Sequence, residues 1–506
     1  MSFNLAAILH ESALADPQAA ALRFGGTVAS YSELDDESGR IAEGLRTAGL
    51  APGEVVAVQL PNIPQFVSLY FGILKAGLVL LPLNPLLKAR EIAYHLRDSR
   101  ARILVTHETF LADAGPGAQT ADVAVYVVPA GHAAPDGTQP VTHLVSGIPL
   151  AEPGGEIHPT DADDTAVLIY TSGTTGKPKG AELTHFQLYM NCTVSGGLLG
   201  ARSDDVSLAV LPFFHIFGLS SVINVAVRFG GSLAIVPRFQ PKAVLDAIET
   251  DGCTVLAGVP TMLHALAEQD VSRRDLSRLR VAISGGASLP AEIMHAFEEK
   301  FGIVVLEGYG LSETASTTSF NASAADRKVL SIGKPIWGVQ MRIAGPDDAP
   351  LPAGRDYVGE ILVRGHNVMK GYLGRPEQTA EAFRNGWFHT GDLGYVDEDG
   401  FYFVVDRSKD LVIRGGYNVY PREVEEVLYQ HPSILEAAVI GKPDERLGEE
   451  VVAVVAVRPG ESLTADEVVA FCRERLSAYK YPREIRFVDE LPKGATGKVA
   501  KAELRE

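Results

Sequence analysis

One segment of the chain has the residue types of a phosphate-binding loop. Residues 170–180 read Tyr-Thr-Ser-Gly-Thr-Thr-Gly-Lys-Pro-Lys-Gly and begin at the end of an apolar run typical of a buried strand. Glycines let backbone N–H groups approach an anion, while the hydroxyls add donors and the lysines add positive charge. The segment is not a Walker A loop, because Lys177 is followed by Pro178. We therefore expect a phosphate cradle here, with a Gly/Thr-rich surface loop as the alternative.

The same segment resembles the phosphate loop of the adenylate-forming superfamily. That superfamily contains the acyl- and aryl-CoA synthetases, the adenylation domains of peptide synthetases and firefly luciferase. Six further stretches resemble its other motifs, in the same order, and together they span nearly the whole chain. These stretches are residues 212–218 (PFFHIFG), 284–290 (SGGASLP), 307–314 (EGYGLSET), 387–394 (WFHTGDLG), 406–416 (beginning DRSKD) and 492–498 (PKGATGK).

The resemblance implies an ATP-dependent ligation in two half-reactions. A small-molecule carboxylic acid and ATP would form an acyl-adenylate with release of pyrophosphate, and the acyl group would then pass to the thiol of coenzyme A. The implied cofactors are ATP, Mg²⁺ and CoA. A mobile C-terminal domain would rotate between the half-reactions about a hinge at Lys409, a conformational step of the kind that often limits turnover.

Three residues carry the implied catalytic roles. Lys498 would bridge the carboxylate and the α-phosphate, where a fixed cation offsets the repulsion between two anions. Glu313 would bind Mg²⁺, with Thr171 as a second ligand, although by itself it would be interpreted as an acidic residue at a helix start. His215, flanked by phenylalanines, would form a gate between the acyl pocket and the CoA tunnel, although by itself it would be interpreted as a packed core histidine.

The implied ATP site combines the phosphate loop with later motifs. Tyr309 would stack on adenine opposite Gly286 and Ala287, and Asp392 would accept hydrogen bonds from the ribose with help from Arg407. Without the resemblance, Tyr309 would be interpreted as a core tyrosine, Asp392 as part of an Asx turn and Arg407 as a member of a surface ion pair. The expected ATP-binding residues are Thr171, Ser172, Gly173, Thr174, Thr175, Gly176, Lys177, Gly286, Ala287, Glu307, Gly308, Tyr309, Gly310, Leu311, Ser312, Asp392, Arg407 and Lys498.

The remaining expected site residues bind CoA and the acid. Gly415 and Gly416 would line the CoA tunnel with His215, because a Cβ would obstruct the pantetheine arm; a plain strand-to-loop turn is the alternative. The expected acyl pocket contains Phe217, Gly218, Val259, Gly285, Gly310 and Ala315.

Several substrate classes are disfavoured by single residues. Amino-acid-activating relatives place an Asp just after the aromatic residue of the 212–218 motif, whereas here Gly218 follows Phe217. A dicarboxylate would need a buried Arg, and residues 216–222, 257–262 and 310–316 contain neither Arg nor Lys. We expect a fatty acid of medium or long chain, with a 4-coumarate- or benzoate-type aryl acid as the alternative. A luciferase-like oxygenase and a non-catalytic acyl- or nucleotide-binding protein are less expected.

Composition excludes other classes of protein. The 506 residues are 46% apolar and 21% charged, as in ordinary globular proteins, and predict several domains or subdomains. The formal net charge of −18 disfavours nucleic-acid binding, and three scattered cysteines disfavour a disulfide framework or a zinc site. The start of the chain lacks a signal-peptide pattern, and no apolar run is long enough to span a membrane. We expect a cytoplasmic monomer or homodimer, with peripheral membrane contact left open.

The elements that must position these residues alternate between strands and helices. Apolar runs such as 55–60, 165–170 and 279–284 predict buried strands, with helices such as 65–76 and 291–300 between them. We expect an α/β fold whose N-terminal adenylation domain, 1–406, has two packed, mostly parallel sheets and a small barrel-like β-subdomain. A small α+β C-terminal domain, 407–506, would complete the molecule.

Overall fold

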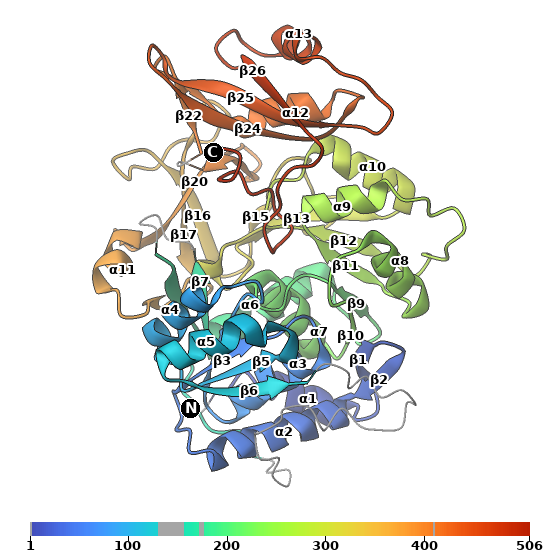
Figure 1. Ribbon diagram of the computed structural model, residues 1–506, viewed down its shortest axis with the longest axis vertical. Coiled ribbons are helices and arrows are strands. Elements are labelled where there is room, and N and C mark those ends of the chain that lie inside the picture. Colours follow the sequence, from blue (N-terminus) through green and yellow to red (C-terminus); the bar gives the residue numbers. More distant parts are fainter. Residues whose placement is uncertain (1–2, 130–155, 172–176, 408–409, 506) are drawn as a thin grey trace.

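The structure is a computed structural model that describes residues 3–129, 156–171, 177–407 and 410–505 (Figure 1). The described chain forms two large sheets, a smaller antiparallel sheet and a C-terminal α+β unit. This arrangement confirms the predicted α/β fold class. In the described ranges, no helix combines the length and apolar character required to cross a membrane.

The first large sheet is predominantly parallel. β3, β4, β5, β6 and β7 run parallel, and antiparallel β8 and β18 extend the sheet beyond β7. Residues within the strands alternate between two cores, as the period of two in a strand requires. Val56 and Val58 face the main core, while Val55 and Ala57 face α4 and α5. The strand bounds are β3 (Val55–Gln59), β4 (Val79–Pro82), β5 (Ile103–His107), β6 (Ala124–Val128), β7 (Thr165–Thr171), β8 (Lys179–Thr184) and β18 (Gly371–Tyr372).

The second large sheet is parallel from β1 through β10, β9, β11 and β12 to β13. Antiparallel β2 closes one edge, and β14 and β15 close the other. The bounds are β1 (Ala20–Phe24), β2 (Thr27–Ser30), β9 (Val206–Ala209), β10 (Ser232–Ile235), β11 (Val255–Gly258), β12 (Val281–Ser284), β13 (Val304–Tyr309), β14 (Ser319–Phe320) and β15 (Lys334–Pro335). The pairing of β1 with β10 joins segments about 200 residues apart and was not predicted.

Helices cover both large sheets. Many begin at recognisable signals, such as the capping box of Ser30 and Glu33 before α2 and the proline at the start of α3. The bounds are α1 (Ala7–Ala15), α2 (Tyr31–Thr47), α3 (Pro64–Lys75), α4 (Ala89–Ser99), η1 (Glu108–Phe110), α5 (Leu111–Ala121), α6 (His185–Leu199), η2 (Phe217–Asn224), α7 (Val225–Arg228), α8 (Pro241–Thr250), α9 (Pro260–Ala267), α10 (Ala291–Phe301), η3 (Ser312–Thr314) and α11 (Pro376–Ala382).

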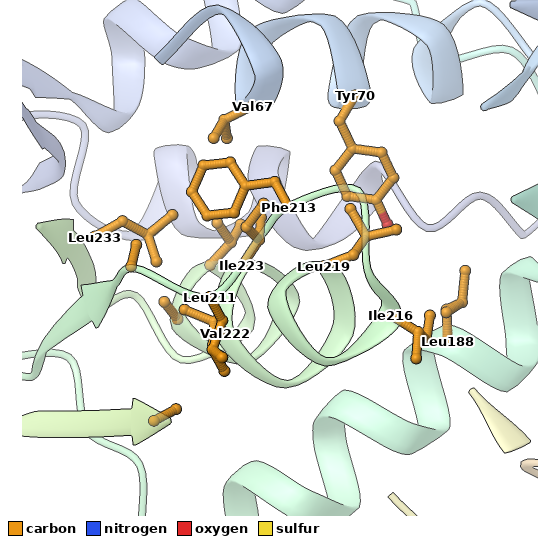
Figure 2. Close-up of a cluster of buried hydrophobic side chains, with 14 of the residues drawn as sticks. Val67, Tyr70, Leu188, Leu211, Phe213, Ile216, Leu219, Val222, Ile223 and Leu233 are labelled. Atoms are coloured by element: carbon orange, nitrogen blue, oxygen red, sulfur yellow. The ribbon is translucent and has the colours of Figure 1, made fainter. Parts of the chain in front are cut away.

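A π-helix, η2, connects the core to the site. Figure 2 shows Leu219, Val222 and Ile223 of η2 in a buried cluster with Val67 and Tyr70 of α3. The wider turn of a π-helix is rare and is found mostly at functional sites. Because one side of η2 is anchored in the core, its other side is held in a fixed position.

The segment after residue 335 forms the small β-subdomain that was predicted. Its strands pair antiparallel in the order β16-β17-β20-β19, and β21 pairs with β20. The bounds are β16 (Val339–Ala344), β17 (Gly359–Gly365), β19 (Phe383–Arg384), β20 (Trp387–Val396) and β21 (Tyr402–Arg407). β20 carries Asp392 and β21 ends at Arg407, so this sheet supplies two of the predicted site residues.

The C-terminal region has a core of its own. Val412, Val424, Val439, Val455 and Val468 belong to one buried cluster that is separate from the main core. The region is drawn in red in Figure 1 and lies beyond one end of the N-terminal part. Its elements are β22 (Val412–Arg414), β23 (Tyr417–Val419), α12 (Pro421–Tyr429), β24 (Ile434–Asp444), β25 (Gly448–Val457), α13 (Ala465–Arg475) and β26 (Glu484–Val488). A separate core allows the region to move as a unit.

We expect Phe213→Ala to lower the free energy of unfolding by about 3–5 kcal/mol. Phe213 is fully buried within the cluster of Figure 2. Its ring centroid lies 5.5 Å from that of Phe66. Its loss would leave a cavity between α3 and η2. Chemical denaturation measures the change, and Phe487→Ala is the matched control because Phe487 is 43% exposed. Equal destabilisation by both variants would contradict this assignment of the core.

Candidate active site

A cavity of about 1110 Å³ lies at the carboxyl ends of several parallel strands. β7 ends at Thr171, β12 ends at Ser284 and β13 ends at Tyr309, and all three residues line the cavity. In open α/β sheets ligands bind outside the carboxyl ends of strands, because loops leaving neighbouring strands meet there. The β-subdomain and the C-terminal region complete the walls through Asp392, Arg407 and Lys498, among other residues.

Glu313 lines the cavity beside Tyr372. The hydroxyl of Tyr372 donates a hydrogen bond to Glu313 Oε1 at 3.1 Å. The ammonium of Lys179 lies 4.7 Å from the centre of the Tyr372 ring, and Lys179 pairs with Thr171 across β7 and β8. Burial and the Glu313 carboxylate raise the pKa of Tyr372, which keeps this phenol protonated as a donor. Glu313 is therefore oriented by Tyr372 beside the end of β7.

Asp392 is held by residues from two elements. The hydroxyl of Tyr309 donates to Asp392 Oδ2 at 2.7 Å, and Arg407 Nε lies 3.4 Å from Asp392 Oδ1. Burial and the neighbouring Asp392 carboxylate raise the pKa of Tyr309 well above its ordinary value. The ring of Tyr309 and the carboxylate of Asp392 thus form one rigid unit at the cavity wall.

Lys498 enters the cavity from the C-terminal region. A Cβ added at Gly286 would lie 2.8 Å from Lys498 Cε, and Gly286 has φ +81°, so only glycine leaves the lysine this space without strain. The Thr261 hydroxyl donates to the carbonyl of Gly497 at 2.6 Å and ties this loop to α9. Burial, followed by the Arg407 cation, lowers the pKa of Lys498 to about 8, while Asp392 acts in the opposite direction.

His215 lies near Lys498 as a neutral side chain. Burial and the cation of Lys498 lower the pKa of His215 to about 3. The backbone N–H of Phe217 donates to His215 Nδ1 at 3.2 Å, so Nδ1 is the acceptor and Nε2 carries the proton. A neutral imidazole does not repel the lysine cation, and its Nε2 remains a donor.

The structure brings most of the predicted site residues together. Those that line the cavity are Thr171, His215, Phe217, Gly285, Gly286, Ala287, Glu307, Gly308, Tyr309, Gly310, Leu311, Ser312, Glu313, Asp392, Arg407 and Lys498. Ser172, Gly173, Thr174, Thr175 and Gly176 of the phosphate loop, and the hinge residue Lys409, lie outside the described residues.

Other predicted residues do not line the cavity in this conformation. They are Lys177, Gly218, Val259, Ala315, Gly415 and Gly416. A Cβ on Gly218 would lie 2.3 Å from the Pro212 carbonyl oxygen, and Val259 is buried behind Gly286. Gly415 and Gly416, with φ +60° and +84°, form the two-residue turn between β22 and β23. Positive φ at both positions is the geometry of a tight hairpin turn.

Sequence analysis missed three residues that hold the site together. Tyr372 orients Glu313, Thr261 holds Gly497, and the backbone N–H of Arg422 in α12 donates to Asp406 Oδ2 at 3.2 Å. A hydroxyl or a backbone N–H in an unremarkable stretch carries no sequence signal for such a role. Their partners come from segments that are distant in the sequence.

Glu307 lies buried at the end of β13 beneath the cavity. Burial raises the pKa of Glu307 to about 7, and the N–H of Leu289 donates to its Oε1 at 3.2 Å. A carboxyl in this state has weak negative charge near neutral pH. It therefore adds little repulsion toward an anionic ligand in the cavity above it.

The residues present fit a nucleotide with a divalent cation. The described part of the chain has no group of three or more His, Cys, Asp or Glu residues that could hold a metal by themselves. Mg²⁺ commonly takes one or two carboxylates and completes its shell with phosphate oxygens and water, which a lone Glu313 would suit. Gly285, Gly286 and Ala287, which are small, line the same cavity as the Tyr309 ring, and these residue types suit a planar base.

Comparisons with known proteins agree with this geometry. The AMP-binding enzyme family matches residues 9–373, and the AMP-binding enzyme C-terminal domain matches residues 423–498. A feruloyl-CoA synthase from Amycolatopsis sp. is 39% identical over 97% of this chain and 96% of its own length. A long-chain-fatty-acid–CoA ligase from Bacillus subtilis is 36% identical over 99% and 94%. The crystal structure of ATP-bound MatB from Rhodopseudomonas palustris is 36% identical, with a TM-score of 0.90, over 100% and 98%.

The chain therefore belongs to the AMP-binding enzyme family, as the motifs predicted. It is an acyl-CoA synthetase of the AMP-forming type. Enzymes of this type use ATP, Mg²⁺ and CoA together with a carboxylic acid.

We expect acyl-adenylate formation to decline as the pH rises above about 8, because the pKa of Lys498 is about 8 and its cation is lost above that value. An ordinary lysine would keep its charge to a much higher pH. The kcat/KM for pyrophosphate release, measured between about pH 6 and 10, reports this loss in the free enzyme. Lys498→Arg is the matched control, because its guanidinium stays charged throughout. The same decline in both enzymes would contradict the assignment to Lys498.

Proposed function

We propose that this protein joins a monocarboxylic acid to coenzyme A through an acyl-adenylate, with Lys498 as the adenylation lysine. The observation that carries the proposal is the position of Lys498, a residue of the C-terminal region that contacts Gly286 inside a cavity walled by the N-terminal part. A cation delivered there can offset the repulsion between two anionic reactants. Asp392 and Tyr309 on the opposite wall supply the groups that suit a nucleoside.

In the first half-reaction a carboxylate oxygen of the acid attacks the α-phosphorus of ATP. The O–P bond to the acid forms as the bond to pyrophosphate breaks. Lys498 holds the carboxylate and an α-phosphate oxygen together, and Asp392 accepts hydrogen bonds from the ribose hydroxyls. Glu313 and Thr171 would hold Mg²⁺, which neutralises phosphate charge when bound. The neutral imidazole of His215 can donate a hydrogen bond from its Nε2–H to the carboxylate.

In the second half-reaction the CoA thiolate attacks the acyl carbon, and AMP leaves with the electron pair of the C–O bond. The thiol needs a path to the adenylate, and Lys498 occupies the cavity in the present conformation. We propose that the C-terminal domain, residues 407–506, rotates on the N-terminal domain, residues 1–406, about Lys409. The rotation would withdraw Lys498 and bring the Gly415–Gly416 turn to a tunnel that His215 gates.

Two alternative proposals concern the class of acid that the enzyme uses. A medium- or long-chain fatty acid is supported by the similarity to the Bacillus subtilis fatty-acid ligase. An aryl acid is supported by the higher identity to the feruloyl-CoA synthase and by the hydroxyl groups of Ser195, Ser221 and Thr317 in the cavity wall. These hydroxyls bond to one another and to the Asn191 carbonyl, and an alkyl chain would offer no partner to the hydrogen-bonding capacity that remains, which is unfavourable. We therefore favour the aryl acid and propose a cytoplasmic enzyme acting as a monomer or homodimer.

A panel of acids tests the proposed reaction directly. We expect pyrophosphate release from ATP and Mg²⁺ with an accepted acid, and continuous turnover only when CoA is added to discharge the adenylate. The panel contains acetate, octanoate, palmitate, benzoate, cinnamate, 4-hydroxycinnamate and malonate. Malonate should be rejected. The Arg and Lys residues of the cavity wall lie on the proposed phosphate side of the cavity and on its C-terminal side, and so none would pair with the second carboxylate. Pyrophosphate release that needs no acid, or continuous turnover without CoA, would contradict the proposal.

Two variants separate the half-reactions. Lys498→Ala should slow adenylate formation about 10²–10³-fold while a supplied acyl-adenylate still reacts with CoA. Gly416→Leu should do the reverse, because the side chain would block the CoA path. Gly460→Leu is its matched control, since Gly460 has the same φ of +84° in open space. Loss of both half-reactions in Lys498→Ala, or equal loss of thioester formation in both glycine variants, would contradict these roles.

A further inference from the structure

One end of the cavity carries a connected group of hydroxyls that the proposed mechanism does not use. Ser221 Oγ lies 2.7 Å from Ser316 Oγ and 3.3 Å from Thr317 Oγ1, and all three residues line the cavity. We call these three residues the hydroxyl cluster. They come from two segments about 95 residues apart, η2 and the turn after η3. Three hydroxyls joined by two hydrogen bonds keep one proton to donate and several lone pairs to accept.

The turn that carries two of these hydroxyls is fixed by buried amides. Asn191 Nδ2 donates to the Thr317 carbonyl at 2.7 Å, and the Thr317 N–H donates to Asn191 Oδ1 at 3.2 Å. Asn367 Nδ2 also donates to the Thr317 carbonyl, at 3.1 Å. Both asparagines are fully buried. The hydroxyl cluster is therefore held in place rather than free to turn into solvent.

The backbone at Ser316 is strained. Ser316 has φ +103°, a conformation that non-glycine residues rarely adopt, and its carbonyl oxygen is so close to Gly310 that a Cβ there would lie 1.3 Å away. Such strain persists where the surrounding structure fixes it and is concentrated at ligand sites. Here it directs Ser316 Oγ toward Ser221 at the cavity wall.

The third hydroxyl is positioned by η2. Phe217, Ser221 and Val225 are spaced four residues apart and line the cavity, while Leu219 and Ile223 of the same segment are buried in the core (Figure 2). Phe217 also lies against Gly285, where a Cβ would approach its ring to 3.1 Å. A ligand at this end would meet the Phe217 ring and a flat glycine backbone before it reached the hydroxyl cluster.

This end of the cavity has no cationic side chain among the described residues. The Lys and Arg residues that line the cavity are Lys179, Arg407, Arg422, Lys498, Lys501 and Arg505. None of them belongs to α6, η2, α7 or the 315–317 turn. A second carboxylate or a sulfonate placed here would lose its hydration without gaining a counter-ion. A neutral polar group would gain partners in the hydroxyl cluster instead.

From this arrangement we infer that Ser221, Ser316 and Thr317 determine substrate specificity, and that the enzyme selects a planar aryl acid with a neutral hydrogen-bonding substituent, such as a ring hydroxyl, at the end opposite its carboxylate. The inference rests on the proposed ligase function and narrows its substrate class. A ring without that substituent would leave the remaining donor proton and lone pairs of the hydroxyl cluster unused, and a polar site rejects such analogues more strongly than an apolar site does.

The test compares 4-hydroxycinnamate with cinnamate, which differ only in the ring hydroxyl. In the wild-type enzyme we expect kcat/KM for 4-hydroxycinnamate to exceed that for cinnamate by about 10-fold or more, because one acid satisfies the hydroxyl cluster. Ser221→Ala combined with Thr317→Val should reduce the ratio of the two kcat/KM values to about 1, mainly by lowering kcat/KM for 4-hydroxycinnamate. In this double variant, kcat/KM for cinnamate should stay the same or rise.

Ser220→Ala is the matched control. Ser220 is the neighbouring residue of η2 and is fully buried, its Oγ has no hydrogen-bond partner among the described residues, and it does not line the cavity. This variant should keep the wild-type ratio. A circular dichroism spectrum and a melting temperature for each variant show whether it has folded.

The outcomes separate this inference from the proposed function. Pyrophosphate release with equal kcat/KM for the two acids, or an unchanged ratio in the double variant, would overturn the assignment of the hydroxyl cluster and leave the ligase reaction intact. A preference for octanoate or palmitate over both aryl acids would likewise overturn it in favour of a fatty acid. No acid-dependent release with any member of the panel would overturn both.

Discussion

The proposed reaction depends on placing one lysine cation where two anions would meet. Lys498 is half-buried with its side chain against Gly286, and both burial and Arg407 make its charge less favourable, so that its pKa falls to about 8. A cation in such a place attracts anions strongly, because little water screens it. The same desolvation would be costly without a ligand. Delivering the lysine on a separate C-terminal unit allows this unfavourable placement to be temporary.

Other features of the structure follow from that constraint. Gly286 must lack a Cβ and adopts a positive φ so that the lysine can approach the backbone. His215 beside it is neutral, since a second cation would add repulsion. Polar contacts join the C-terminal region to the N-terminal part, such as the hydrogen bond from Thr261 to Gly497 and the ion pair of Arg458 with Glu268 at 2.8 Å. Contacts of this kind can break without exposing apolar core.

Sequence reasoning predicted the fold class and much of the site for a physical reason. Parallel strands place the residues that follow them at one edge of a sheet, so the motifs at the ends of β12 and β13, which are neighbours in one sheet, had to converge. Elements with strong periodicity, such as α10 and β3, were predicted within a few residues of their observed bounds. The position of Lys498 was assigned through the family resemblance, because no local pattern shows that a loop near the chain end enters a cavity.

The features that could not be predicted from the sequence depend on contacts between distant segments. The pairing of β1 with β10 and the hydrogen bond from Tyr372 to Glu313 join residues whose own neighbours carry no sign of the partner. The π-helix was also missed, because a run such as Phe217–Asn224 has no distinctive period. The hydroxyls of Ser221 and Ser316 are ordinary residues in the sequence and meet only in the folded chain.

The two ends of the cavity therefore differ in how they recognise a ligand. At the end proposed for the nucleotide, charged groups and an aromatic ring would act on groups that every reaction of this type shares, namely phosphates, a ribose and a carboxylate. At the acyl end the described wall is neutral, and its polar groups are hydroxyls on η2 and on the turn after η3. Hydroxyls can be gained or lost by single substitutions without disturbing the charges that support catalysis. Such a division allows one catalytic arrangement to serve different acids, because specificity is carried by side chains that take no part in the chemistry.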